Sequence, residues 1–257
     1  MLGRATTWIA FFTVLVGVAT LFGISQPVYA DTIDGFSSDP GWDGYQNHDG
    51  DQDFGWSNTN NAGGAAAGEI GGDIIRTPLA WYAQEITPIN AANTSLSASG
   101  TVVLSGGGNF IMGWFDSTSA GSGGLDWDTT HMIGIRSDDA SLYLYGDKGS
   151  SLIASNVVPG ESGPTTFDIA YDHTTGILTA TSGQGITESR GVSGGLGALT
   201  NLDRFGILNL HIPGNGAGAN IFVDDLDFTG HVLIPEPTSI VLMMLGLGLA
   251  PFVGRRR

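Results

Sequence analysis

Three aspartates near the start of the chain have a spacing that suits a hard cation. Asp49, Asp51 and Asp53 alternate with other residues in the run Asp-Gly-Asp-Gln-Asp. Calcium-binding loops commonly place oxygen ligands at alternating positions. The run is not an EF-hand, because Phe54 stands where the loop glycine belongs and no glutamate occupies the twelfth position. It predicts either a calcium site or a solvated acidic loop.

A second candidate metal site lies near the other end. Asp224 alternates with apolar residues in the run Phe-Val-Asp-Asp-Leu-Asp-Phe at 222–228, so it shares a strand face with them. If that face is the core, the carboxylate needs an arginine, several N–H donors or a metal, because burying it unpaired is costly. Asp225, on the opposite face, joins the cation together with Asp34 or Asp39. We expect one structural Ca²⁺ near the N- and C-terminal strands.

Four residues are candidates for carbohydrate contact. Trp81 and Tyr82 are adjacent, and Trp114 alternates with Asp116 on one predicted strand. Planar rings pack on the apolar C–H faces of sugars, and a nearby acceptor fixes orientation. The alternative is that these rings belong to the core, where strands normally bury aromatics.

Residues for known catalytic chemistries are scarce. A retaining glycosidase needs two carboxyl groups about 5–5.5 Å apart, and the glutamates of residues 31–230 are isolated in sequence. No Gly-x-Ser-x-Gly elbow lies near a predicted strand-to-helix turn, where a serine hydrolase needs it. The chain has no cysteine, which excludes thiol catalysis and thiolate zinc sites. We therefore expect no catalytic residues and no enzyme activity, with a glycan hydrolase as the alternative.

Composition indicates an acidic all-β domain. The chain contains 41 glycines and only 13% charged residues, which favours short strands and tight turns over surface helices. Residues 31–230 hold five basic and 24 acidic side chains, a net charge of −19. Such a field repels polyanions, so nucleic acid is excluded as a partner.

Short strand-like runs separated by Gly, Asn, Asp, Ser and Pro fill the middle of the chain. We predict strands at 68–76, 80–86, 95–104, 109–116, 131–137, 142–145, 165–171, 177–181, 204–210 and 220–229, with a hairpin over 165–181. Ten strands without intervening helices predict one antiparallel β-sandwich domain of jelly-roll type over residues 31–230. A parallel β-helix is the alternative, although no fixed-period repeat supports it.

The N-terminus has the pattern of a signal peptide over residues 1–30. Arg4 provides the positive charge and residues 8–24 the apolar run, and Val28 and Ala30 are small residues before a predicted cleavage site. The alternative is a permanent membrane anchor. We expect export across the inner membrane.

Residues 231–257 form a three-part C-terminal segment. Pro235, Glu236 and Pro237 precede an apolar stretch, and the basic cluster Arg255-Arg256-Arg257 ends the chain. The apolar stretch just reaches the length of a membrane span, and the positive-inside rule keeps the arginines in the cytoplasm. The alternative is a simple C-terminal anchor.

This order of features resembles the PEP-CTERM sorting signal of Gram-negative bacteria. The resemblance implies transient inner-membrane anchoring, cleavage near the tripeptide by an exosortase-like membrane protease, and transfer to the cell surface or the medium. It also implies a producer that makes exopolysaccharide and biofilm matrix.

The middle of the chain resembles the concanavalin A-like lectin/glucanase group. The resemblance rests on short stretches: Asp34-Gly35-Phe36 and Pro40-Gly41-Trp42, then Gly113-Trp114-Phe115, then Phe222-Val223-Asp224-Asp225-Leu226. It implies a sandwich whose first and last strands pair and whose one sheet is concave.

Together these features predict a non-enzymatic, secreted or surface protein of the exopolysaccharide matrix that contacts carbohydrate. The two alternatives are a glycan hydrolase of the glucanase type and a purely structural matrix protein.

Overall fold

The computed structural model describes ten segments of the chain: residues 31–32, 35–75, 79–106, 110–120, 131–138, 141–146, 150–154, 163–192, 199–209 and 218–230. The predicted signal peptide, its cleavage site at Ala30, the predicted ligand Asp34 and the whole sorting segment lie outside them. Among the described residues, no helix is long and apolar enough to cross a membrane.

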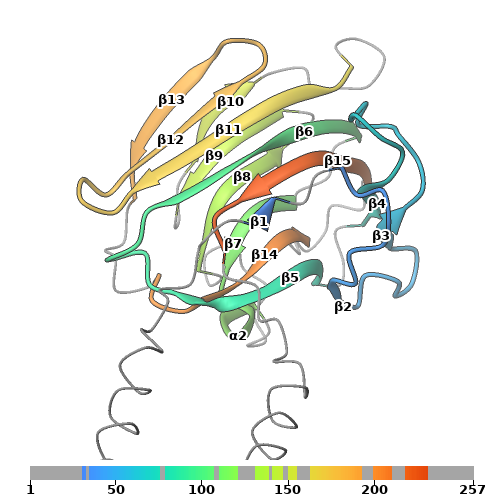
Figure 1. The fold of residues 1–257 in the computed structure, drawn as a ribbon, viewed down its shortest axis with the longest axis horizontal. Coiled ribbons are helices and arrows are strands. Elements are labelled where there is room, and N and C mark those ends of the chain that lie inside the picture. The colour runs from blue at the N-terminus through green and yellow to red at the C-terminus, as the bar shows by residue number, and fades with distance from the viewer. Residues whose placement is uncertain are drawn as a thin grey trace, which may run out of the picture. The chain divides into compact units, whose positions relative to one another are not determined.

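Two antiparallel sheets face each other (Figure 1). The eight-stranded sheet has the order β13 (Thr187–Gly191), β12 (Ile177–Ser182), β11 (Thr165–Asp172), β6 (Leu96–Gly106), β15 (Ala219–Phe228), β4 (Glu69–Ile74) and β3 (Asp53–Ser57), with β1 (Asp31–Thr32) also paired to β15. The seven-stranded sheet has the order β10 (Ser150–Ala154), β9 (Ser141–Gly146), β8 (Met132–Asp138), β7 (Phe110–Phe115), β14 (Leu202–Asn209), β5 (Ala80–Ile89) and β2 (Asp43–Tyr45). The short helix α2 (Ser117–Ala120) follows β7.

Alternation of side chains along the strands builds the core between the sheets. In β11 the residues Phe167, Ile169 and Tyr171 are buried, while the residues between them are exposed. The inward residues of both sheets form one continuous apolar cluster. The two-sheet sandwich that composition and strand count predict is therefore confirmed, and the parallel β-helix is excluded because every described pairing is antiparallel.

The predicted hairpin is confirmed, and its turn has a clear chemical basis. Strands β11 and β12 pair from Asp172↔Ile177 outward. The backbone N–H and Oγ1–H of Thr174 both donate to the Asp172 carboxylate, at 2.9 and 2.7 Å. Gly176 has φ +67° and donates its N–H to the Asp172 carbonyl oxygen. Such side-chain-to-backbone bonds are what Asp contributes to turns.

The central part of the seven-stranded sheet is buried on its outer face as well. All six residues of β7 are buried, and its outward Ile111 and Phe115 join a second apolar cluster with Met132 and Leu208. This explains why the run Phe-Ile-Met-Gly-Trp-Phe shows no polar alternation, since a strand buried on both faces reads as continuously apolar.

Candidate functional site

One exposed aromatic pair stands at the end of the seven-stranded sheet. Strand pairing places Tyr45 of β2 opposite Trp81 of β5, and their rings stack with centroids 4.3 Å apart and 15° between planes. Tyr45 is 40% exposed. Trp81 is partly buried and also packs edge-on against Phe115. The stack therefore holds an exposed ring in a fixed orientation.

Charged side chains adjoin this pair on the same outer face. Arg204 of β14 pairs with Glu85 of β5, and its guanidinium lies 3.5 Å from the Glu85 carboxylate and 3.6 Å from that of Asp43. The Arg204 side chain is only 16% exposed, whereas Glu85 and Asp43 are 49% and 58% exposed. We call Asp43, Tyr45, Trp81, Glu85 and Arg204 the aromatic–arginine patch.

The other three residues predicted to contact carbohydrate have structural roles in the fold. Trp114 is fully buried and donates its indole N–H to the Thr229 carbonyl oxygen at 2.7 Å. Tyr82 is 7% exposed and belongs to the core. Asp116 caps helix α2, accepting hydrogen bonds from Thr118. All three residues are buried, which corrects the prediction that they form an open sugar-binding surface. Of the four residues predicted to contact carbohydrate, only Trp81 lies in the aromatic–arginine patch.

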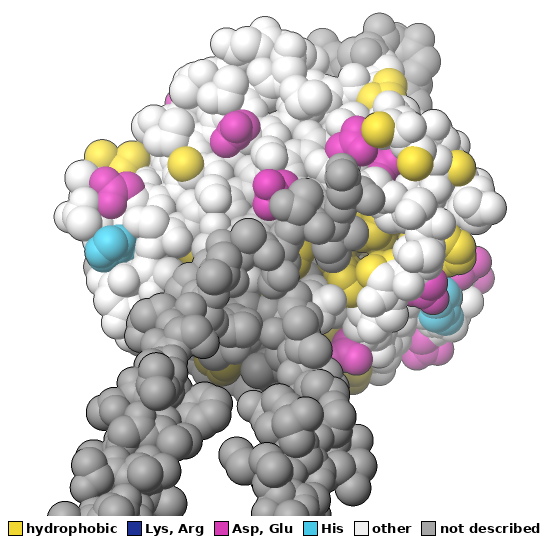
Figure 2. Space-filling view, viewed as in Figure 1, with side chains coloured by type: hydrophobic (Ala, Val, Ile, Leu, Met, Phe, Trp, Pro, Cys, Tyr) yellow, Lys and Arg dark blue, Asp and Glu magenta, His cyan; other side chains and the backbone are white. Residues whose placement is uncertain are grey.

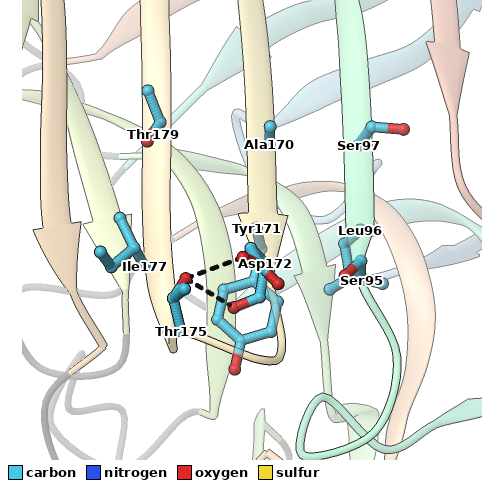
Figure 3. Close-up of a pocket in the computed structure, with 9 residues that line it drawn as sticks. All are labelled: Ser95, Leu96, Ser97, Ala170, Tyr171, Asp172, Thr175, Ile177 and Thr179. Atoms are coloured by element: carbon cyan, nitrogen blue, oxygen red, sulfur yellow. Dashed lines mark hydrogen bonds between the residues drawn. The ribbon is translucent and has the colours of Figure 1, made fainter.

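A shallow hollow lies on the outer face of the eight-stranded sheet (Figure 3). It has a volume of about 470 Å³ and is lined by residues of β6, β11 and β12 and the β11–β12 turn. Its polar groups are hydroxyls and the Asp172 carboxylate, which accepts a hydrogen bond from Thr175. Ile177 is exposed there, but Tyr171 is buried, so the hollow offers no open aromatic ring.

One face of the domain is acidic (Figure 2). On the face drawn in Figure 2, the coloured charged side chains of the described residues are aspartates and glutamates, with no lysine or arginine visible. This agrees with the net charge of residues 31–230 and disfavours polyanionic ligands.

Two consecutive aspartates within β15, an interior strand of the eight-stranded sheet, meet two loops. Asp224 is fully buried, although the core-facing residues just before it are Ile221 and Val223 and not Phe222 as the sequence pattern predicts. The pairing of β15 with β6 shifts register between Asp224 and Asp227, and Asp225 has φ +47°. This bulge brings both carboxylates near Gly35 and the Gly64–Ala65 segment. We call Gly35, Gly64, Ala65, Asp224 and Asp225 the aspartate junction.

The hydrogen bonds of the aspartate junction are incomplete. Asp224 Oδ1 accepts the N–H of Asp225 at 2.7 Å, and the Asp225 carboxylate accepts the N–H of Ala65. Asp224 Oδ2 is buried without a hydrogen-bond partner. Burial raises the pKa of Asp224, and the charges of Asp225 and Glu69 raise it further, against the lowering effect of the Asp225 N–H.

The other predicted metal ligands among the described residues do not gather with these two. Asp39 accepts hydrogen bonds from the Gly41 N–H and the Tyr82 hydroxyl instead. Asp49, Asp51 and Asp53 are exposed, and Asp53 pairs with His48 at 2.8 Å. Among the described residues, no cluster of three or more acidic or histidine side chains is present.

The fold and these sites define an antiparallel two-sheet sandwich, an architecture that fits a binding protein and an enzyme equally. No protein-family model and no curated protein matches the chain. Solved structures with some similarity include a seed lectin from Lotus tetragonolobus (14% identity, TM-score 0.46, 81% of this chain and 100% of that chain). They also include lectin II from Ulex europaeus (13%, 0.43, 76% and 100%) and an alginate lyase from Pseudomonas aeruginosa (12%, 0.39, 72% and 89%). At these levels the similarities carry no argument about function, which must come from the sites.

Proposed function

We propose that this chain is a non-enzymatic carbohydrate-binding protein of the cell surface or extracellular matrix, and that the aromatic–arginine patch is its sugar site. The supporting observation is the stacked Tyr45–Trp81 pair, which leaves a large ring exposed and fixed in place. Among the described residues, Tyr45 and Ile177 are the exposed large apolar side chains, and only Tyr45 has a flat ring.

The patch combines the two kinds of contact that sugars require. An aromatic face covers the apolar C–H face of a pyranose, and fixed polar groups bind its hydroxyls and set orientation. Because Tyr45 is already stacked, binding loses little side-chain entropy. Glu85 and Asp43 offer acceptors and Arg204 offers donors, all held near one another by ion pairs.

The charge of the domain selects the ligand class. A net charge of −19 over residues 31–230 repels uronate or sulfate polymers at long range. A neutral polysaccharide is not subject to this electrostatic repulsion. We therefore propose a neutral glycan as the ligand.

The glycan hydrolase is the competing function. The two carboxylates of the patch both face the Arg204 guanidinium, an arrangement that binds hydroxyls but provides no proton donor opposite a nucleophile. We propose binding without cleavage.

A neutral-glycan array, combined with a reducing-sugar release assay on the glycans that bind, tests this function. The proposal expects array signal without sugar release. Sugar release indicates the hydrolase, and silence in both assays indicates a structural matrix protein, so either result contradicts the proposal.

A further inference from the structure

The β-bulge in β15 turns two neighbouring carboxylates toward the same place. In a regular strand Asp224 and Asp225 point to opposite faces, as the sequence pattern predicts. Here the register shift and the positive φ of Asp225 place both near Gly35, at 4.0 and 3.5 Å from the position that a Cβ on this glycine would occupy. A non-glycine residue at positive φ is uncommon and is retained where the surroundings or function require it.

The buried carboxylate of Asp224 has neither a positive partner nor a full set of hydrogen bonds among the described residues. Asp224 has no exposed surface, its Oδ2 has no hydrogen-bond partner, and none of the ion pairs among the described residues includes it. A buried carboxylate without a counter-charge costs several kcal/mol. Two adjacent negative charges increase that cost.

The loops facing the aspartates are fixed in position. Glu69 is fully buried and accepts hydrogen bonds from the backbone N–H groups of Asn61 and Ala62, at 2.9 and 2.8 Å. These bonds anchor the segment leading to Gly64 and Ala65. On the other side, the Trp56 indole donates to the Phe36 carbonyl oxygen at 2.8 Å, next to Gly35. A Cβ on Gly64 would collide with the Asp224 carboxylate, so this position needs glycine.

We propose that the aspartate junction binds one Ca²⁺ between the carboxylates of Asp224 and Asp225. The inference is independent of the proposed sugar site. Two anionic oxygen donors, no sulfur or imidazole ligand, and adjacent loop backbone match the all-oxygen, irregular coordination that Ca²⁺ accepts and Mg²⁺ tolerates poorly. Water would supply the remaining oxygen ligands.

The ion has a structural role in this proposal. β15 lies between β6 and β4 and also pairs with β1, so a cation at its bulge ties the last strand to the loops that follow β1 and β3. Calcium then stabilises the folded state by binding to it alone.

Calorimetric titration of CaCl₂ into the chelator-treated protein, paired with thermal melts, tests the site. We expect one Ca²⁺ per chain, a rise in Tm of about 5–10 °C at a hundredfold excess over Kd, and a smaller rise with MgCl₂. Absence of both binding heat and a Tm shift overturns the proposal, as does an equal response to magnesium.

Matched variants locate the ion. Asp224→Asn and Asp225→Asn each weaken calcium binding at least about tenfold, whereas Asp73→Asn, an exposed carboxylate on β4, leaves it unchanged. The half-buried Asp225 serves as the second probe if Asp224→Asn does not fold. Unchanged calcium affinity in Asp225→Asn, or an equal loss in Asp73→Asn, contradicts this location.

Discussion

At single positions, the space around a side chain decides which substitutions the protein accepts. Gly64 is a clear case, because the position of its missing Cβ is already occupied by the Asp224 carboxylate. Trp114 is the opposite case, since its ring and its N–H are both used inside the protein. At this scale, the room around a side chain matters more than its chemical type.

Gly64→Ala is expected to destabilise the protein by about 1–3 kcal/mol, because the Asp224 side chain or the loop must move. Gly191→Ala on β13 is the control, since a Cβ there meets no atom within 4 Å. Urea denaturation of both variants measures the difference. Equal midpoints for the two would show that the contact at Gly64 costs nothing.

The sequence could locate some functional residues but not their partners. The alternation of 222–228 predicts a core face that runs through Phe222 and Asp224, but the core-facing residues before the bulge are Ile221 and Val223, and the buried Asp224 lies against Gly64. The same rule places Asp225 on the opposite face, and the bulge makes that prediction wrong. Tyr45 was missed because its stacking depends on the β2–β5 pairing, which joins residues far apart in the chain. No pattern of neighbouring residues in the sequence predicts such a contact.

At the scale of elements, the interior strands could be predicted and the edges could not. All ten predicted strands are present with small shifts at their ends. The missed strands include β2, β3, β10 and β13, which form the four ends of the two sheets. Edge strands are shielded on fewer sides, so they carry polar and glycine residues rather than apolar alternation. The run Thr-Glu-Ser-Arg-Gly of β13 is an example.

The β11–β12 turn leads to a prediction about pH. Hydrogen bonds from Thr174 and Thr175 lower the pKa of Asp172, so folding favours its ionised form. This contribution is complete above the unfolded pKa of about 3.9 and is lost as the pH falls through the lower folded value. Asp172→Ala should therefore lower Tm at pH 7, with a gap that narrows below about pH 4.

Thermal melts across this pH range, with Asp168→Ala as the control, check the turn. Asp168 faces outward on the same strand but lies outside the turn. A deficit in Asp172→Ala that stays constant with pH, or an equal pH dependence in the control, contradicts the assignment.

For the whole molecule, the terminal segments and the folded middle of the chain support different predictions. The terminal segments predict export and exosortase-dependent sorting, and we propose that both are removed. Mass spectrometry of the protein from a sorting-competent Gram-negative host should then show a mature N-terminus at Asp31 and a C-terminus near Pro235–Pro237. A chain that retains Arg255–Arg257 in the surface or medium fraction would contradict the sorting proposal.

A β-sandwich is compatible with many activities. The central claim, that this chain binds a neutral glycan, therefore depends on the aromatic–arginine patch at the edge of the seven-stranded sheet. Titration calorimetry with the best neutral oligosaccharide from the array, on the wild type, Tyr45→Ala and Ile177→Ala, tests that claim most directly. Loss of the aromatic face should weaken binding about 3–10-fold in Tyr45→Ala, whereas Ile177→Ala, which removes the exposed apolar side chain of the other sheet, should bind like the wild type. Unchanged affinity in Tyr45→Ala, or a comparable loss in Ile177→Ala, would contradict the account.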